Sequence, residues 1–319
     1  MNRRRHDQES FNQRVRTAKQ EALLNSVRTG ARYARHAALL LIVVSVVVAC
    51  ATLREPAGSP VTETQRLAER PDTDERLNAT LWHQTSAEYR LLTQMIYSIA
   101  KPQLERALAD PQWTAEPSQK EGFQDLPPAV IMDIDETVLD TSVFQGRLVK
   151  DRLEYSEDVW KIWLRKQEAA GVPGAVDFIS FAQARGVTVF FVTNRDYPDE
   201  EETRTSLMSV GIRLPENIDP VLSRGERADW GSDKATRRRF IARSYRVLLL
   251  VGDDLGDFIS EYRGTPQERV KEALKHSEWG TKWILLPNPI YGSWEGSLYN
   301  FNTQLGREGI LQRKFEQLR

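Results

Sequence analysis

Residues 130–140 read Val-Ile-Met-Asp-Ile-Asp-Glu-Thr-Val-Leu-Asp, so two aspartates directly follow a short apolar run. The run at 129–132 includes β-branched residues and follows two prolines, which favours a buried strand over a helix. On an extended segment, Asp133 and Asp135 are two residues apart and point to the same side. At the carboxyl end of a parallel strand, both carboxylates would face the crevice in which open α/β sheets bind ligands.

The paired aspartates indicate a bound cation. Two like charges this close are unfavourable without a cation or a shared proton, and carboxylate oxygens suit a hard metal ion. An ordinary turn is the alternative, since Asp is common in turns. However, Thr137 completes an Asp-x-Asp-x-Thr pattern directly after the apolar run. This pattern resembles the first motif of the haloacid dehalogenase superfamily, in which the first aspartate is the nucleophile that attacks phosphate.

Three further segments resemble the remaining motifs of that superfamily, in the same order. The apolar run 187–192 ends at Thr193, which resembles the hydroxyl that holds the phosphate. Lys234 stands at the start of a predicted helix and resembles the third motif, a fixed ammonium. The apolar run 247–251 precedes an acidic cluster at 252–257, which resembles the fourth motif. Each segment alone also fits an ordinary strand end, helix surface or polar turn, but four in this order favour the superfamily.

The pattern of elements predicts the fold class. Apolar strands alternate with helical patterns between residues 129 and 287, which predicts an α/β fold with a doubly wound parallel sheet. Before the first strand, apolar residues recur at three- to four-residue steps over 75–110 and predict an N-terminal helical extension, which Pro102 breaks into two helices. The intervals between motifs leave no room for a large cap domain. We therefore expect an open site in a domain at 75–319.

The N-terminal part of the chain predicts a membrane anchor. Residues 1–36 hold nine Lys/Arg and three Asp/Glu, which we interpret as a basic leader without a stable fold or as the product of a start codon placed too early. Residues 37–50 are apolar and end in Val-Val-Ala-Cys, which resembles a bacterial lipoprotein box with Cys50 as the lipidated residue. An uncleaved N-terminal membrane anchor is the alternative, although the uncharged stretch is near the lower limit of about 17–25 residues for a span. Residues 51–74 contain several prolines and are interpreted as a linker.

A narrower resemblance covers the chain from about residue 77 to residue 294. The chain resembles the class C acid phosphatases in five segments, 88–90, 133–137, 173–175, 193–195 and 252–258. The loop at 287–295, which contains Tyr291, fits the same family. This resemblance implies a bacterial outer-membrane lipoprotein of the cell envelope, facing the periplasm or the outside. It also implies an enzyme that dephosphorylates nucleoside 5′-monophosphates and other small phosphomonoesters.

The resemblance assigns roles to individual residues. It implies that Mg²⁺ is held by the carboxylates of Asp133 and Asp253 and by the backbone carbonyl of Asp135, with support from Asp257, while a contribution of Asp254 stays open. Asp133 would attack phosphorus, and Asp135 would act as the general acid and base. The phosphoryl oxygens would be held by Thr193, Asn194 and Lys234.

Three aromatic residues are candidates for contact with a nucleobase, because stacking accepts any base. They are Tyr291, Trp160 and Trp163. Ordinary packing in the core or at the rim of the site is the alternative for each of them.

Charge and motif content limit the other classes of function. The whole chain has a formal net charge of -1 and its leader is basic, so the body is acidic. An acidic body argues against nucleic acid as a partner, and local groups such as Lys234 and Arg195 must then bind a phosphomonoester. A phosphatase for sugar phosphates is the main alternative. A surface lipoprotein that only binds is another, but such a protein need not keep Asp133, Asp135 and Asp253 together with Lys234.

Overall fold

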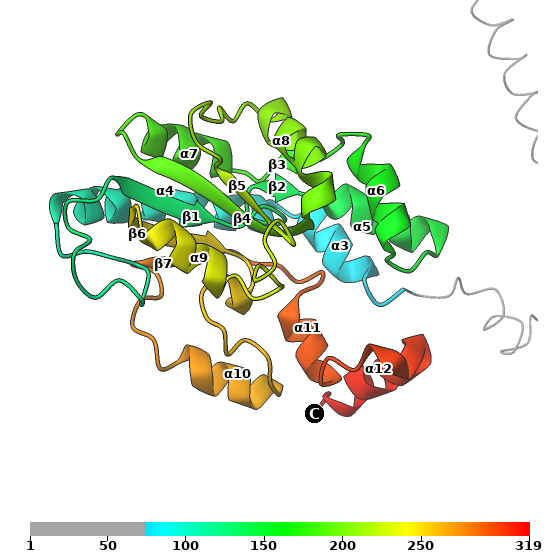
Figure 1. The fold of residues 1–319 in the computed structure, drawn as a ribbon. Helices are drawn as coiled ribbons and strands as arrows, with labels where there is room; N and C mark the ends of the chain where they lie inside the picture. The colour runs from blue at the N-terminus through cyan, green and yellow to red at the C-terminus, as the bar shows by residue number, and fades with distance from the viewer. Residues whose placement is uncertain (1–73) are drawn as a thin grey trace, which may run out of the picture. The chain divides into compact units, whose positions relative to one another are not determined.

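The computed structural model describes residues 74–319 (Figure 1). The predicted leader at 1–36, the lipoprotein box with Cys50 and the linker up to residue 73 lie outside the described residues. Within residues 74–319, no helix combines the length and the apolar character needed to cross a bilayer.

A five-stranded parallel sheet with the order β5-β4-β1-β6-β7 forms the centre of the domain. In chain order its strands are β1 (Pro128–Met132), β4 (Thr188–Asp196), β5 (Val221–Arg224), β6 (Arg246–Gly252) and β7 (Trp283–Leu285). In the central strand, Ile131 is aligned with Phe190 on β4 and with Leu250 on β6. The chain first adds strands on one side of β1 and later on the other. The carboxyl end of β1 is therefore the switch point at which such sheets bind ligands.

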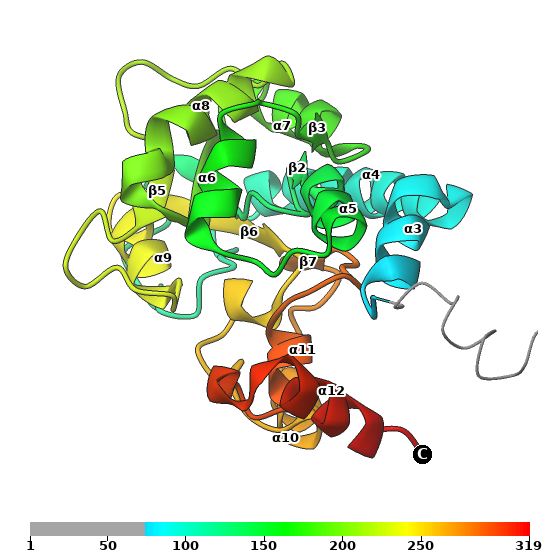
Figure 2. The same ribbon diagram turned by 90° about the vertical axis from the view of Figure 1, so that its right-hand side faces the viewer.

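Both faces of the sheet are buried, which explains why its strands are continuously apolar rather than alternating. Val130 and Met132 point into one core, whereas Ala129 and Ile131 point into the core on the opposite face. The first core is covered by α4 (Ala87–Ala109), α7 (Ala175–Gln183) and α8 (Glu200–Ser209), and the second by α9 (Ala235–Ala242). Figures 1 and 2 show helices on both faces, which confirms the predicted doubly wound α/β fold.

The N-terminal helical extension exists, but the predicted break at Pro102 is wrong. The helix α3 (Leu77–Thr85) ends before Ser86, whose extended backbone separates it from α4 and whose hydroxyl accepts a hydrogen bond of 3.1 Å from the amide of Tyr89. Pro102 lies inside α4. The helix continues beyond the proline because its following turns are buried against the sheet, for example through Leu104.

A small insertion separates β1 from β4, in agreement with the prediction that no large cap domain is present. It consists of α5 (Ser142–Asp151) and α6 (Glu157–Leu164), which lie between the two short antiparallel strands β2 (Leu139–Asp140) and β3 (Ala170–Gly171). Its own apolar cluster includes Phe144, Leu148, Trp160, Trp163 and Leu164.

The C-terminal region adds helices beside the sheet. These are α10 (Pro266–Ala273), α11 (Ser293–Leu298) and α12 (Gly306–Glu316). In both ribbon views they lie together, at the end of the domain opposite to α7 and α8. Short 3₁₀ turns occur at η1 (Tyr197–Asp199), η2 (Leu255–Asp257) and η3 (Thr303–Leu305).

Candidate active site

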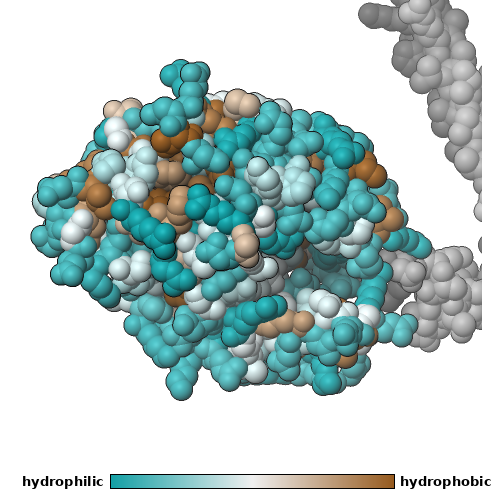
Figure 3. Space-filling view, in the orientation of Figure 1, coloured by the Kyte–Doolittle hydropathy of each residue, from teal (hydrophilic) through white to brown (hydrophobic). Residues whose placement is uncertain are grey.

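A cavity of about 830 Å³ lies at the carboxyl ends of the central strands. Its walls include Asp133 after β1, Asn194 on β4, Asp253 after β6 and Lys234, which precedes α9. In Figure 3 the surface is hollowed between the body that carries the sheet and the C-terminal helices. The structure therefore gathers residues from all four sequence motifs at one edge of the sheet.

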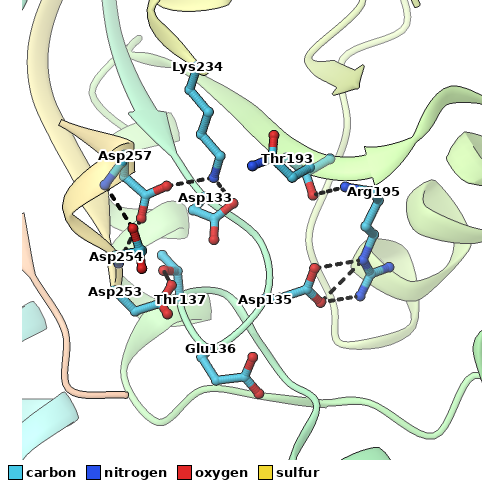
Figure 4. A network of polar contacts seen from close by, with 12 residues as sticks. Asp133, Asp135, Glu136, Thr137, Thr193, Arg195, Lys234, Asp253, Asp254 and Asp257 are labelled. Carbon is cyan, nitrogen blue, oxygen red and sulfur yellow. Dashed lines mark hydrogen bonds and ion pairs between the residues drawn. The ribbon is translucent and has the colours of Figure 1, made fainter. Parts of the chain in front are cut away.

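Lys234 joins two of the predicted carboxylates. Its ammonium contacts Oδ1 of Asp133 and donates a hydrogen bond of 2.6 Å to Oδ1 of Asp257 (Figure 4). The Lys234 side chain is buried, and burial alone would lower its pKa. The two carboxylates outweigh this effect and raise the pKa of Lys234, so that the lysine stays charged.

Three carboxylates come close enough together to hold one cation. Oxygens of Asp133, Asp253 and Asp257 all lie within 4.8 Å of one another. Burial raises the pKa of Asp133 from 3.8 to about 7, an effect that Lys234 opposes and that the charges of Asp257 and Asp135 reinforce. Burial also raises the pKa of Asp253, and the charges of Asp133 and Asp257 add to it. These groups resist ionisation without a counter-charge, which is what a divalent cation with oxygen ligands would supply.

Neighbouring groups fix the orientation of Asp253. The hydroxyl of Thr137 donates to Oδ1 of Asp253 at 3.0 Å, and the side-chain amide of Asn288 donates to Oδ2 at 2.9 Å. Gly252 leaves room for the loop that follows, because a Cβ at this position would lie only 2.5 Å from Cβ of Asp257. The acidic cluster therefore depends on a glycine at the end of β6.

Asp254 is turned away from this cluster. Its Oδ1 accepts hydrogen bonds from the amide of Gly256 at 2.8 Å and from the hydroxyl of Ser293 at 2.6 Å, and its Oδ2 accepts one from the amide of Ser293 at 2.6 Å. The structure thus places Asp253 at the candidate metal site and uses Asp254 to hold the start of α11.

Asp135 does not share the carboxylate cluster but pairs with an arginine. The side chain of Arg195 donates from Nη2 to Oδ1 of Asp135 at 2.7 Å and from Nε to Oδ2 at 3.1 Å. In Figure 4 this pair stands beside the group formed by Asp133, Lys234 and Asp257. Arg195, which the sequence suggested as a local phosphate-binding group, is occupied by Asp135 in this structure.

A buried arginine holds the segment that carries Thr193 and Asn194. The side chain of Arg237 contacts the backbone carbonyl of Thr193 and donates to Oδ1 of Asn194 at 2.7 Å. The side-chain amide nitrogen of Asn194 in turn donates to the backbone carbonyl of Ser232 at 3.1 Å. The hydroxyl of Thr193 is buried and accepts a hydrogen bond of 3.1 Å from the backbone amide of Arg195.

The three aromatic candidates lie in different surroundings. Tyr291 lines the cavity, and its hydroxyl contacts the buried carboxylate of Glu136. Trp160 lines the cavity as well, with the guanidinium of Arg195 5.2 Å from its ring centre. Trp163 packs instead inside the insertion, where its ring centre is 5.4 Å from that of Phe144.

Sequence reasoning missed several residues that shape the site. They are Glu136, Asn288, Arg237 and Tyr97, the last of which donates a hydrogen bond of 2.7 Å to the backbone carbonyl of Thr137. Glu136 adopts a positive φ of 55°, which is uncommon for residues other than glycine and could not be predicted from the residue type. Glu136 and Asn288 lie in segments that resemble the family, 133–137 and 287–295, whereas no pattern in the sequence pointed to Arg237 or Tyr97.

Known proteins resemble both the sequence and the fold. The sequence matches the family described as HAD superfamily, subfamily IIIB (Acid phosphatase) over residues 46–294. It is 23% identical over 164 residues to the stem 31 kDa glycoprotein of Glycine max, covering 50% of this chain and 58% of that protein. It is 28% identical over 123 residues to the class B acid phosphatase of Morganella morganii, covering 36% of this chain and 52% of that protein. The chain thus spans little more than half the length of these two curated relatives.

Two solved structures of the class C acid phosphatase from Bacillus anthracis have a similar fold. One is 29% identical with a TM-score of 0.67, and the other, with tungstate bound, is 28% identical with a TM-score of 0.66. Each comparison covers 76% of this chain and 96% of the solved chain. Since the family match extends over most of the sequence and the site contains the expected carboxylates and lysine, the chain belongs to the acid phosphatases of HAD subfamily IIIB.

Proposed function

We propose that this protein is a Mg²⁺-dependent phosphatase that hydrolyses small phosphomonoesters, with nucleoside 5′-monophosphates as the preferred class, through an aspartyl-phosphate intermediate. One observation carries the proposal: the buried ammonium of Lys234 contacts the carboxylates of Asp133 and Asp257, and oxygens of Asp133, Asp253 and Asp257 lie within 4.8 Å of one another. A phosphate dianion repels an anionic nucleophile, so the site must neutralise charge before attack. This arrangement provides a fixed cation and a place for a second one.

In the first step, a carboxylate oxygen of Asp133 attacks phosphorus as the bond between phosphorus and the leaving oxygen breaks. Asp135 transfers its proton to the leaving oxygen, which departs with the bonding electron pair as an alcohol. Lys234 stays protonated and neutralises a phosphoryl oxygen. Thr193 and Asn194 would donate to the other oxygens, since the hydroxyl of Thr193 accepts from the backbone amide of Arg195 and keeps its own proton, and the side-chain amide of Asn194 donates only one hydrogen bond within residues 74–319, to Ser232.

In the second step, water replaces Asp133 at phosphorus. Asp135, now a carboxylate, takes a proton from the water molecule as its oxygen attacks, and the bond between phosphorus and Asp133 breaks. Inorganic phosphate leaves, Asp133 is again a carboxylate, and Asp135 again carries the proton. The two steps therefore need no oxidant or other co-reactant.

The carboxylates of Asp133, Asp253 and Asp257 would hold the divalent ion. When all three are ionised beside Lys234, two negative charges remain uncompensated. A bound Mg²⁺ would balance them and stabilise charge on the phosphoryl oxygens. That the related class C phosphatase of Bacillus anthracis was solved with tungstate bound supports an oxyanion as the ligand of this site.

The preference for nucleotides is supported by the shape and lining of the cavity. Its volume of about 830 Å³ exceeds the need of a phosphate group alone. Tyr291 and Trp160 add aromatic surface to its wall, on which any nucleobase can stack. A sugar phosphate would fill the same cavity without using these rings.

Phosphate release by the described domain tests the proposal. We expect release from nucleoside 5′-monophosphates, ribose 5-phosphate and phenyl phosphate that requires Mg²⁺ and stops in EDTA. Asp133→Asn should abolish release without loss of fold, whereas Asp125→Asn, at an exposed position, serves as the matched control. Stable labelling of the parent protein, but not of Asp133→Asn, by phosphate from substrate after acid quenching would reveal the intermediate. The proposed phosphatase activity would be refuted if the folded, Mg²⁺-loaded protein released no phosphate from any of these substrates.

We also propose that the protein is anchored in the cell envelope as an outer-membrane lipoprotein. The support comes from the sequence, in which the apolar residues 37–50 end at Cys50, the single cysteine of the chain. The full chain should enter the detergent phase in a phase-partition assay and carry a lipid mass at Cys50. Cys50→Ser should remove the lipid mass; an unchanged precursor in both proteins would favour an uncleaved anchor instead.

A further inference from the structure

Arg195 is held rigidly from several sides. It is only 4% exposed, although it borders the cavity. Its Nη1 donates to the hydroxyl of Thr203 on α8 at 3.3 Å, and its guanidinium lies 5.2 Å from the ring centre of Trp160. Its backbone amide donates to the hydroxyl of Thr193. A side chain fixed in this way can impose an orientation on whatever group it binds.

The group that Arg195 binds is Asp135. The two oxygens of this carboxylate accept different numbers of hydrogen bonds from the described residues. Among these bonds, Oδ1 accepts one of 2.7 Å from Nη2 and one of 3.2 Å from Nε, whereas Oδ2 accepts only one, of 3.1 Å, from Nε. A neutral carboxyl group can still accept the short bond through one oxygen while the other carries the proton. The less engaged oxygen, Oδ2, is therefore the one free to exchange a proton.

We propose that Arg195 is a positioning residue that orients Asp135 for proton transfer to the leaving oxygen. This inference rests on the proposed function and adds a residue to its first step. The guanidinium holds Oδ1 and turns Oδ2 toward the leaving group, so that the proton on Oδ2 moves to the leaving oxygen as the phosphorus–oxygen bond breaks. Arg195 itself neither contacts phosphate nor exchanges a proton.

The paired N–H donors of the Arg195 guanidinium are essential to this role. Arginine presents paired donors that match a carboxylate, whereas lysine offers a point charge on a flexible stem. Arg195→Lys should keep the charge but orient Asp135 less well, and Arg195→Gln should lose both. Neither change removes Thr193, Lys234 or Asp133, so attack on phosphorus stays possible.

If Arg195 positions the general acid, its replacement should lower kcat/KM only for substrates whose leaving group needs a proton. A merely structural role would lower kcat/KM for all substrates alike. A 2,4-dinitrophenolate departs without a proton, whereas the alkoxide of a nucleotide needs one. General acid catalysis contributes about 10²–10⁴-fold. We therefore expect Arg195→Gln to lower kcat/KM by about 100-fold for a nucleoside 5′-monophosphate but by less than about fivefold for 2,4-dinitrophenyl phosphate. Arg195→Lys should fall between parent and Arg195→Gln on the nucleotide.

Two comparisons complete the experiment. Arg204→Gln is the matched control, because Arg204 on α8 pairs with Glu200 at 2.9 Å in a partly buried position and is not among the cavity-lining residues. It should leave the dependence on leaving group unchanged. In an Asp135→Asn background, Arg195→Gln should lower kcat/KM for the nucleotide by less than about threefold, because a residue that acts through Asp135 has no further effect once that acid is gone.

The test is to measure kcat/KM of all these proteins on both substrates, with circular dichroism as a check of folding. Selective loss on the nucleotide, absent from Arg204→Gln and from the Asp135→Asn background, supports the inference. Equal losses on both substrates, or additive losses in the double variant, overturn it while leaving the phosphatase intact. A parent protein that hydrolyses neither substrate overturns the proposed function and this inference with it. Should Arg195→Gln fail to fold, the comparison of Arg195→Lys with the parent decides in the same way.

Discussion

The ammonium nitrogen of Lys234 lies 2.6 Å from Oδ1 of Asp257 and also contacts Asp133, so one buried cation joins the carboxyl ends of β1 and β6. This lysine comes from the start of α9, on the opposite side of the sheet from α4 and α7. It thereby provides positive charge beside Asp133, the nucleophile that we propose.

Replacing Lys234 should separate catalysis from metal binding. We expect Lys234→Gln to lower kcat/KM about 10²–10³-fold, because a charge that stabilises the phosphoryl oxygens is lost. Loss of one partner from a buried ion pair should also destabilise the metal-free protein by about 3–5 kcal/mol. Mg²⁺ affinity should rise, since three carboxylates then face no competing ammonium. Urea unfolding, kinetics and titration calorimetry measure these effects. Lys120→Gln, at an exposed position, is the control, and a Lys234→Gln enzyme with parental kcat/KM would contradict the assigned role.

The stability of the metal-free protein should fall as the pH rises. Burial, reinforced by neighbouring carboxylates, raises the pKa of Asp133 to about 7 and raises the pKa of Asp253 and of Glu136 above their ordinary values. Groups with a raised pKa in the folded state favour folding while protonated, and this contribution is lost as the pH rises from about 4 through about 7. In EDTA, Tm should therefore be higher at pH 5 than at pH 8.

Magnesium should reverse that dependence. The ion binds ionised carboxylates and must displace protons at low pH, so its stabilising effect should be larger at pH 8 than at pH 5. Differential scanning fluorimetry at both pH values, with Mg²⁺ and with EDTA, measures the shift in Tm. Asp253→Asn should reduce the shift. A metal effect of equal size at pH 5 and pH 8 would speak against this carboxylate cluster as the metal site.

Asp253 and Asp254 should respond differently to the same substitution. Asp253→Asn removes a carboxylate from the cluster and should weaken Mg²⁺ binding at least about tenfold. Asp254→Asn weakens the hydrogen bonds that Asp254 accepts from Ser293, because the acceptor loses its charge. It should lower the free energy of unfolding by about 1–3 kcal/mol and leave the Mg²⁺ affinity unchanged. Calorimetry and urea unfolding compare the two. If Asp254→Asn loses Mg²⁺ affinity and Asp253→Asn does not, Asp254 and not Asp253 is the metal ligand.

Trp163 should matter for stability rather than for substrate. Its side chain is 3% exposed and packs within the cluster of α5 and α6. Trp163→Ala should lower the free energy of unfolding by about 3–5 kcal/mol because it leaves a cavity in a packed cluster. KM for nucleoside 5′-monophosphates should remain at the parental value, measured at a temperature at which the variant is folded. A raised KM with parental stability would place Trp163 at the substrate.

Tyr291 should affect only substrates that carry a base. Tyr291→Leu removes an aromatic wall of the cavity and should raise KM for a nucleoside 5′-monophosphate about 5- to 100-fold, the range expected for loss of one base stack. KM for ribose 5-phosphate, which lacks the base, should change little. Tyr291→Phe is the matched variant that keeps the ring but loses the contact with Glu136. Equal increases in KM for both substrates after Tyr291→Leu would show that the ring does not bind the base.

The local pattern of the sequence was sufficient for the elements around the site. The apolar runs 129–132, 187–192 and 247–251 correctly predict β1, β4 and β6, because strands buried on both faces need continuous apolar residues. The strand β5 was missed, since it has four residues and ends in Ser223 and Arg224. Pro102 was given too much weight, and Ser86 too little, because burial of the helix face outweighed the local cost of the proline.

By itself, then, the sequence determined the α/β class, the order of the four motifs and the residue types available for phosphate chemistry, because these follow from side-chain period and chemical identity along the chain. Only the tertiary structure decided that Arg195 pairs with Asp135, that the carboxylate of Asp254 bonds to Ser293 instead of joining the acidic cluster, and that Trp160 but not Trp163 lines the cavity. The physical reason is that these contacts join residues on separate elements. Their distances and orientations are set by how strands and helices pack, and no local pattern of the chain encodes that packing.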